Sequence, residues 1–355
     1  MDEHNTRWRR FTDGILADIQ RQTPTFHGTP TTLFFGGGTP SLAPAWVISE
    51  IIQAAALPID AEVTLEANPE DITPLHCDNL LSAGVNRLSL GVQTFQEKHA
   101  RLLNRASSVA DAHRTVKTVS QAGFKSWSID LMFSLPNQTL HDLQKDLDVL
   151  SETRPPHVSL YGLTAEPDTP LGDAVADKKI ILPSSNDWVS KYERIQSHLS
   201  SIGLERYEVS NFASQGHTCK HNLNTWRFQP YMGIGPAAHG LTPAGRRTRN
   251  VPQVDAYFNT QNPTQTGPLP TQNDVAIEYI LGAIRLAEGI NTDQLLRTSE
   301  HYLEKHTTQR LVESGLLKTT TAGFALTNLG FHVADGVTLS LTSGLLPSKN
   351  QDVRL

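Results

Sequence analysis

Apolar residues recur along the first half of this chain in two alternating patterns. Trp8, Phe11, Ile15 and Ile19 are spaced three or four positions apart, which predicts an amphipathic helix over about 5–21. Short apolar runs follow, and further segments of helical spacing separate them. The runs predict strands at 31–35, 63–66, 86–93, 126–132 and 157–163, and the segments predict helices at about 44–56, 75–83, 110–122 and 140–152.

Five strands separated by helices indicate an α/β fold. Right-handed crossovers make such strands parallel, so they form either an open doubly wound sheet or a (βα) barrel. Glycine or polar residues end each strand, among them Glu66, Asn68, Gln93 and Asp130. Because the carboxyl ends of barrel strands open onto one face, this favours a (βα) barrel with a site at that face. For any one residue, a helix cap or a loop contact is an equally good explanation.

A glycine turn ends the first strand. Residues 31–35 read TTLFF, which predicts a buried strand, and Gly36, Gly37 and Gly38 follow directly. Glycines let the backbone turn sharply and leave its amides open to a ligand. The alternative is a tight strand-to-helix turn without a ligand.

The second half of the chain changes character. A helix is expected over 186–202, a block rich in His, Trp, Tyr and Gly extends to Gly240, and the composition of 241–274 predicts a linker or irregular segment. From Val275 the order helix, helix, hairpin, helix predicts a small, mainly helical, winged-helix-like domain. We therefore expect a barrel domain at 1–180, an extension and linker at 181–274, a C-terminal domain at 275–341 and a tail at 342–355.

Composition and charge narrow the function classes. The 355 residues carry a net charge of −6, and this acidic balance argues against nucleic acid as the main partner. No apolar run approaches the roughly 18 residues that span a membrane, and the N-terminus does not resemble a signal peptide. We expect a cytoplasmic protein without a membrane span, and leave peripheral membrane contact and the oligomeric state open.

Nine motifs together resemble one family. They read GGGTPS, EANPED, NRLSLGVQTF, LLNR, SIDLMFSLPNQT, HVSLYGL, YEVSNFA, HN followed by W, and YMGIGPAAHG. Their order and spacing resemble the radical S-adenosylmethionine (radical SAM) proteins of the oxygen-independent coproporphyrinogen III oxidase group, and within it the haem chaperone (HemW) branch. The resemblance extends from residue 5 to about 341 and implies a partial radical-SAM-type (βα) barrel, from which the family's first strand is missing.

The resemblance implies a SAM site at the strand ends. It places the methionine moiety of the cofactor against Gly37, Gly38 and Thr39, where no bulky side chain blocks the backbone donors. It also implies that Glu66 and Asp130 accept hydrogen bonds from the ribose hydroxyls or from the ammonium group of SAM.

Three further residues complete the implied cofactor contacts. Gln93 and Arg105 are expected to address the methionine carboxylate, which a guanidinium can bind through two parallel hydrogen bonds. Thr164, at the last strand end, is a weaker match to an adenosine contact. The alternatives are that Arg105 pairs with an acid on a helix surface and that Gln93 satisfies the backbone.

The segment HNLNTW resembles the haem chaperone signature HNxxYW, with Thr225 where tyrosine is usual. In that branch the histidine is associated with haem, and neutral imidazole is a common axial ligand of haem iron. The resemblance therefore implies that His221 binds haem. His217, Cys219 and His221 also alternate along the chain, so an adventitious metal site is a further, weakly specified alternative.

The family's [4Fe-4S] cluster lacks its usual ligands here. Radical SAM proteins bind it through three cysteines in CxxxCxxC, whereas this chain has only Cys77 and Cys219, far apart in the sequence. We therefore expect these residues not to ligate the cluster. The unprotected apolar strand at 31–35 favours a chain that begins downstream of the family's first strand over a cluster-free pseudoenzyme.

The expected function follows from the resemblance. It is a haem chaperone-like role, in which haem is bound and passed to acceptor proteins with SAM in support. One alternative is an oxygen-independent coproporphyrinogen III oxidase, which decarboxylates propionates by radical chemistry in porphyrin biosynthesis. Another is a cluster-free binding protein. The expected ligands are SAM and haem or a porphyrin, no residue is predicted to be catalytic, and whether the chain is an enzyme stays open.

Overall fold

The structure is a computed structural model that describes residues 3–348, with side chains described from residue 5. The chain consists of two compact units, within which most contacts between residues are made. The sheet unit comprises residues 32–52 and 60–218, and the composite unit comprises the described parts of 1–31, 53–59 and 219–355. The domain boundaries expected at 180, 274 and 341 stay predictions.

A seven-stranded, mostly parallel sheet forms the sheet unit, in the order β1-β2-β3-β4-β5-β7-β6. Its strands are β1 (Thr32–Phe35), β2 (Glu62–Ala67), β3 (Arg87–Gln93), β4 (Ser126–Phe133), β5 (His157–Gly162), β6 (Glu205–Arg206) and β7 (Asn211–Ala213). The first five run parallel, while β7 pairs antiparallel with both β5 and β6. Since the described strands do not close into a ring, the expected partial barrel is confirmed.

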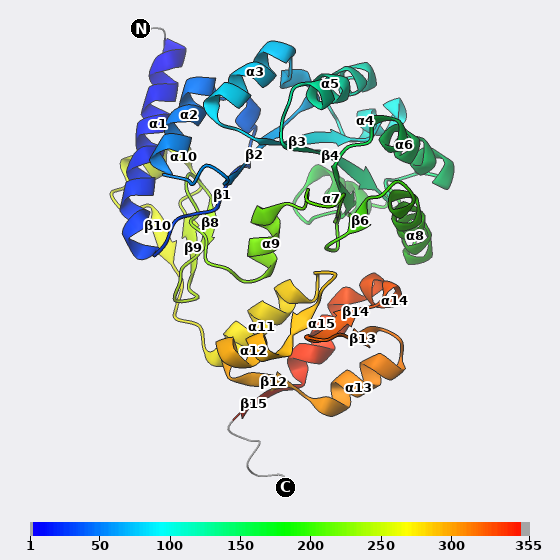
Figure 1. Cartoon of the computed structure of the whole chain (residues 1–355). Coiled ribbons are helices and arrows are strands. Elements are labelled where there is room, and N and C mark those ends of the chain that lie inside the picture. Colours follow the sequence, from blue (N-terminus) through cyan, green and yellow to red (C-terminus); the bar gives the residue numbers. More distant parts are fainter. Residues whose placement is uncertain (1–2, 349–355) are drawn as a thin grey trace. The chain divides into compact units, whose positions relative to one another are not determined.

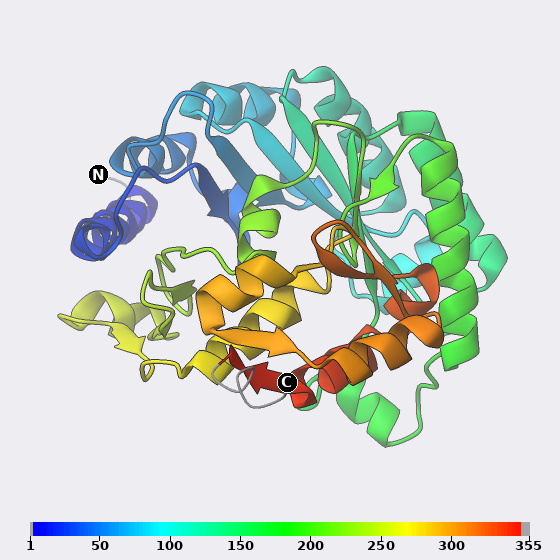
Figure 2. The same cartoon turned by 60° about the horizontal axis from the view of Figure 1, so that its bottom comes forward.

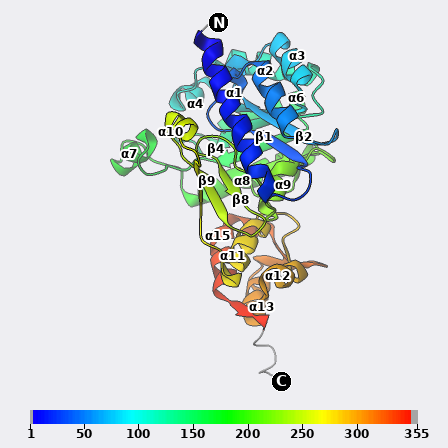
Figure 3. The ribbon, with the colours of Figure 1, turned by 90° about the vertical axis from the view of Figure 1, so that its left-hand side faces the viewer.

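Helices follow the parallel strands and lie along the outer side of the sheet (Figure 1, Figure 2). They are α2 (Ala45–Ala54), α3 (Pro74–Ala83), α4 (Glu97–Leu102), α5 (Val109–Gln121), α6 (Leu140–Thr153) and α8 (Ser185–Ser201). The short helix α7 (Pro170–Ala176) stands apart from the sheet (Figure 3). Capping boxes begin α5 and α6, where Ser108 and Thr139 accept hydrogen bonds from the backbone three residues later. The helices predicted in this region are confirmed, and the short α4 and α7 were not predicted.

The two faces of the sheet differ in polarity. One face carries apolar residues that are almost fully buried, namely Val63, Leu65, Leu88, Leu90, Ile129, Leu131, Val158 and Leu160. The alternate positions carry Thr64, Glu66, Arg87, Ser89, Ser128, Asp130, His157 and Ser159. Parallel strands covered on both faces are usually apolar throughout. The polar alternation therefore marks one face as the place for polar chemistry.

Strand β1 differs from the prediction of a buried strand. It pairs with β2 and with no other strand in the described part of the chain, so it is an edge of the sheet. All four of its residues are only half-buried. The apolar run TTLFF correctly predicted a strand. Its burial was not predictable from the run, because burial depends on the neighbouring strands and helices.

The composite unit contains α1 (Glu3–Gln22), α9 (Lys220–Trp226), α10 (Val254–Asn259) and a three-stranded antiparallel sheet. Its strands are β8 (His239–Leu241), β9 (Arg247–Asn250) and β10 (Thr264–Thr266). Figure 3 shows α1 running beside α10 and this sheet. The prediction of an irregular 241–274 is wrong over β9, α10 and β10. These elements are short and polar, so they give no hydrophobic periodicity.

The buried Asp18 carboxylate joins α1 to the glycine-rich GIGP segment. It accepts hydrogen bonds from Gln22 Nε2 at 2.8 Å, from the Gly235 amide at 3.2 Å and from Asn250 Nδ2 at 3.3 Å. The Tyr257 hydroxyl donates to the same carboxylate. These bonds give the GIGP motif a structural role, because an acceptor from the first helix determines the conformation of its backbone.

The last part of the composite unit is mainly helical with one hairpin, as expected, but the helix at 292–299 and the short strands on either side of it were not predicted. It contains α11 (Gln272–Ala283), β11 (Ile290–Asn291), α12 (Thr292–Ser299), β12 (His301–Leu303), α13 (Lys305–Glu313), β13 (Leu317–Thr319), β14 (Gly323–Leu326), α14 (Asn328–His332), α15 (Ala334–Ser343) and β15 (Leu345–Pro347). Strands β11, β14 and β13 form one sheet, and β12 pairs with β15. Among the described residues, no helix combines the length and apolarity needed to cross a bilayer.

Candidate functional site at the strand ends

The glycine turn after β1 holds the Glu66 side chain. The Gly37 amide donates to Glu66 Oε2 at 3.2 Å. A Cβ at Gly36 would lie 2.8 Å from the Phe34 ring and 3.1 Å from Glu66 Oε2, so glycine makes room for the carboxylate. Gly37 and Gly38 have φ of +74° and +62°, and a Cβ at either would meet nothing within 4 Å. The turn therefore presents open backbone beside a carboxylate, as a ligand cradle requires.

Two carboxylates, Glu66 on β2 and Asp130 on β4, lie at this end of the sheet and repel each other electrostatically. Asp130 accepts from Ser89 Oγ at 2.8 Å and from Ser128 Oγ at 2.9 Å. Burial raises the pKa of Asp130, although these serine hydroxyls oppose the shift. Burial also raises the pKa of Glu66, and the negative charge of Asp130 adds to that effect while the Gly37 amide opposes it. The pair suits a ligand that brings positive charge or hydroxyl donors. The alternative in which Asp130 accepts from loop amides is not observed.

Arg105 lies beside the ends of β2 and β3. Its Nη2 donates to Asn68 Oδ1 at 2.9 Å and to the Gly91 carbonyl at 2.8 Å. Its Nε is buried and has no hydrogen-bond partner among the described residues. The alternative in which Arg105 pairs with an acid on a helix surface is therefore wrong. Asn68 is likewise not a helix cap through its side chain, because its amide oxygen accepts from Arg105.

Gln93 occupies a strained position at the end of β3. Its φ is +69°, and the pairing of β3 with β4 shifts register between Leu90 and Gln93. The following loop is held by the buried Asp146 carboxylate, which accepts from the Phe95 amide at 2.8 Å and from Thr94 Oγ1 at 3.0 Å. Burial raises the pKa of Asp146 to about 6. The register shift in β3 and the loop bonded to Asp146 thus determine the backbone position of Gln93.

Thr39 and Thr164, the other two predicted cofactor contacts, make fewer interactions with the rest of the strand-end site. Thr39 is half-buried and precedes the short 3-10 helix Pro40–Leu42, and its side chain does not cap that helix. Thr164 is exposed and lies two residues beyond the end of β5. No hydrogen bond among the described residues joins either threonine to Glu66 or Asp130. The roles of all the predicted site residues stay predictions.

The sequence-based prediction missed the serines that surround Asp130. Ser89 and Ser128 donate to it directly, and Ser128 lies 3.3 Å from Ser159 through their hydroxyl oxygens. Tyr161 on β5 is 42% exposed, and partial burial together with the negative charge of Asp130 raises the pKa of its phenol. The sequence did contain a pattern that could have revealed these serines, because polar residues alternate with apolar ones along β3, β4 and β5.

His221 lies half-buried on the short helix α9. His217, Cys219 and His221, considered above as a weakly specified metal site, do not lie on one strand, because α9 begins at Lys220. No group of three His, Cys, Asp or Glu side chains in the described part of the chain could hold a metal ion. Thr225, the departure from the family signature, donates to the His221 carbonyl at 3.1 Å within the helix.

Helix α9 is held tightly against α11. A Cβ at Gly282 would lie 2.1 Å from the Trp226 carbonyl oxygen, so only glycine permits this approach. The Arg285 guanidinium lies 5.5 Å from the centre of the Trp226 ring. Arg227 forms a two-pronged ion pair with Glu288, at 2.9 and 3.1 Å. These contacts give the HNLNTW segment a defined position in the composite unit.

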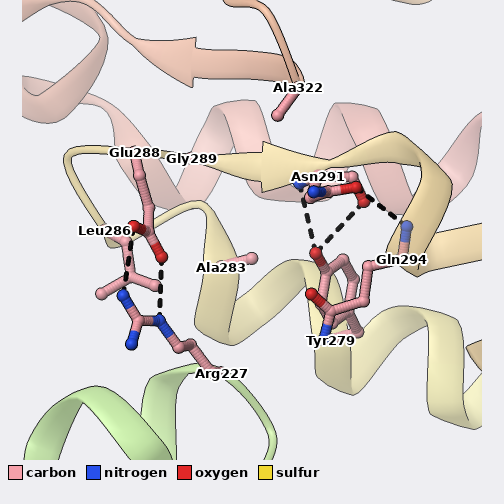
Figure 4. Close-up of a pocket in the computed structure, with 9 residues that line it drawn as sticks. All are labelled: Arg227, Tyr279, Ala283, Leu286, Glu288, Gly289, Asn291, Gln294 and Ala322. Carbon is pink, nitrogen blue, oxygen red and sulfur yellow. Dashed lines mark hydrogen bonds and ion pairs between the residues drawn. The ribbon is translucent and has the colours of Figure 1, made fainter.

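One cavity of the composite unit, with a volume of about 200 Å³, lies next to this packing (Figure 4). The Arg227–Glu288 pair forms part of its lining, and the Tyr279 hydroxyl exchanges hydrogen bonds with the Asn291 backbone. Pockets for small molecules typically start at roughly 300 Å³. The cavity is small, its charged groups are already paired, and none of the sequence-predicted residues lines it.

The two cysteines do not fit an iron–sulfur cluster. Cys77 lies in α3 and Cys219 precedes α9, and both are fully buried. Burial raises the pKa of the Cys77 thiol to about 11, which disfavours the thiolate that iron requires. Two buried cysteines cannot supply three thiolate ligands.

Comparison with known proteins decides the family. The Radical SAM superfamily profile matches residues 4–150. The heme chaperone HemW of Escherichia coli is 37% identical over 289 residues, which cover 77% of this chain and 74% of that protein. The chain belongs to the HemW family. The HemW of Haemophilus influenzae is 35% identical, covering 78% of this chain and 73% of that protein, and the HemW of Lactococcus lactis is 31% identical, covering 86% and 83%. The family expected from the nine motifs is confirmed.

The fold of this HemW family member also matches a solved structure. Coproporphyrinogen III oxidase (HemN) from Escherichia coli, a radical SAM enzyme, superposes with a TM-score of 0.78 at 20% identity. The match covers 96% of this chain and 85% of that chain. At that identity the similarity shows a shared α/β radical SAM fold and carries no further information about activity.

Proposed function

We propose that this chain is a haem chaperone that binds SAM at its strand-end site, binds haem through His221, and passes haem to acceptor proteins. The haem part is supported by the names of the relatives, which are heme chaperones at 31–37% identity. The SAM part is supported by one observation above all. The buried Nε of Arg105 has no partner among the described residues, at the strand-end edge that also carries the carboxylates of Glu66 and Asp130.

The charges of SAM suit this arrangement. The cofactor offers a carboxylate, an ammonium, a sulfonium and two ribose hydroxyls. The carboxylate would receive Arg105 Nε, which satisfies a buried donor that otherwise costs about 1–3 kcal/mol. The positive groups and hydroxyls would approach Glu66 and Asp130, whose mutual repulsion they relieve. The open backbone at Gly37 and Gly38 leaves room for a ligand beside Glu66.

A binding role fits these residues better than reductive cleavage of SAM. In the family, the [4Fe-4S] cluster supplies the electron for that cleavage, and Cys77 and Cys219 do not provide its three ligands. The coproporphyrinogen III oxidase alternative has only the similarity of fold in its favour. We therefore assign to these residues the binding of SAM and haem.

The SAM site is tested by calorimetric titration. Wild type is expected to bind SAM, and Arg105→Lys is expected to bind about tenfold more weakly, because a lysine cannot reproduce the fork that joins Asn68, Gly91 and the ligand. Arg101→Lys is the matched control, since Arg101 is exposed and lies 4.0 Å from Glu97 on the same helix. Equal affinities of wild type and Arg105→Lys, or no binding by wild type, would contradict the proposed site.

The haem site is tested by visible spectroscopy. Haem titrated into wild type is expected to give a shifted Soret band, which His221→Ala should lose. His239→Ala, an exposed histidine on β8, is the control and should keep the band. Transfer is followed by mixing the loaded protein with apomyoglobin as a probe acceptor. Identical spectra and affinities for wild type and His221→Ala would refute the assignment of His221.

A further inference from the structure

A chain of hydrogen bonds runs through the polar side of the sheet and ends at Asp130. The Tyr207 hydroxyl lies 2.8 Å from His157 Nε2, and His157 Nδ1 lies 2.9 Å from Ser128 Oγ. Ser128 Oγ in turn donates to Asp130 Oδ1 at 2.9 Å. Strand register explains the alignment, because Ser128 on β4 pairs directly with His157 on β5. Neither His157 nor Tyr207 belongs to the predicted SAM contacts.

The direction of this chain follows from its protons. When Asp130 is ionised it can only accept, so in that state the single hydroxyl proton of Ser128 is committed to Asp130. His157 Nδ1 must then carry a proton and donate to Ser128 Oγ. The buried imidazole is neutral, since burial, with the charges of Arg87 and His217, holds its pKa well below the usual range. Its Nε2 is therefore an acceptor, and the Tyr207 hydroxyl donates to it.

Protonation of Asp130 would reverse every bond. The carboxylic acid would donate to Ser128, the Ser128 hydroxyl would donate to Nδ1, and Nε2–H would face the Tyr207 oxygen. The tautomer of His157 is thus coupled to the charge of Asp130, and a Tyr207 hydroxyl that donates to Nε2 favours the ionised carboxylate. The titratable or charged groups that face Asp130 and His157 are Glu66 on β2, Arg87 on β3, Tyr161 on β5, and Tyr207 and His217 on loops.

We propose that His157 and Tyr207 are positioning residues for Asp130, which act through Ser128 to hold the carboxylate ionised and oriented for the hydroxyl and cationic groups of the ligand. This inference rests on the proposed SAM site. It adds His157 on β5 and Tyr207 in the loop after β6 to that site. It also gives the HVSLYG and YEVSNF motifs a chemical role beyond packing.

The proposal is tested first by nitrogen NMR on protein labelled with ¹⁵N-histidine. In wild type the His157 ring is expected to be neutral and protonated at Nδ1. Tyr207→Phe removes the donor to Nε2 and should shift the ring toward a mixture of tautomers. This measurement needs no ligand. It therefore determines the direction of the hydrogen bonds even if wild type binds no SAM and the proposed function fails. A wild-type ring protonated at Nε2 would overturn the proposal.

Affinity for SAM is the second measurement. His157→Phe is expected to bind about tenfold more weakly than wild type. His157→Asn, whose amide can donate near the Nδ1 position, should recover most of the loss, which a purely structural role would not predict. His198→Phe is the matched control, because His198 also pairs with a serine, Ser151 at 2.8 Å, without reaching Asp130. Wild-type affinity in His157→Phe, or equal losses in His157→Phe and His157→Asn, would refute the positioning role.

Discussion

Gly282 permits the close packing that holds the HNLNTW helix in place, and its substitution gives a sharp test. A Cβ at this position would lie 2.1 Å from the carbonyl oxygen and 3.0 Å from the carbonyl carbon of Trp226. Real Cβ atoms essentially never approach another heavy atom closer than 3.0 Å. Because both contacts are backbone atoms, no change of rotamer relieves the overlap, and α9 must move away from α11 by nearly 1 Å.

The cost of Gly282→Ala follows from two opposing terms. Overpacking of a well-packed contact costs about 1–3 kcal/mol, whereas replacing a helical glycine by alanine returns about 0.5–1 kcal/mol. The net result is a loss of about 1 kcal/mol in the free energy of unfolding, or roughly 2–4 °C in Tm for a unit of this size. Since α9 carries His221, we also expect weaker haem binding.

The assay compares Gly282→Ala with Gly336→Ala by calorimetry and urea unfolding. Gly336 lies in α15, and a Cβ there would meet nothing within 4 Å. That control should gain about 0.5–1 kcal/mol from helix propensity alone. The two alanines should therefore shift stability in opposite directions. A Gly282→Ala protein as stable as Gly336→Ala, with unchanged haem affinity, would refute the packing argument.

Two further substitutions test the sheet unit. The folded pKa of Asp146 is about 6, above its unfolded value of 3.8, so the proton is bound more tightly in the folded state and stability falls as pH rises between these values. Asp146→Asn should make Tm less dependent on pH between 3.8 and about 6. An unchanged slope of Tm against pH in this range would contradict the raised pKa of Asp146. Thr139→Ala removes the acceptor for the Asp142 amide at 3.1 Å. It should lower the free energy of unfolding by about 1 kcal/mol in urea, and a change below about 0.3 kcal/mol would contradict the cap.

Local patterns predicted most elements of the barrel because each depends on nearby residues. Amphipathic spacing in α1 and the apolar runs of β2 to β5 reflect periodicities that any helix or half-buried strand requires. The same patterns failed where elements are short and polar, as in β9 and β10, and where a strand such as β1 is an edge. Helix α9 was missed because seven residues give less than two full periods of spacing.

The sequence by itself determined the family, the order of the elements and the residue types at the strand ends. Only the tertiary structure decided what those residues contact. Register between neighbouring strands brings Ser89 to Asp130 and His157 to Ser128, and the fold of the loop after α4 brings Arg105 to Asn68. The physical reason is that residue type and spacing encode local conformation, whereas a hydrogen bond between distant residues exists only after the chain has packed.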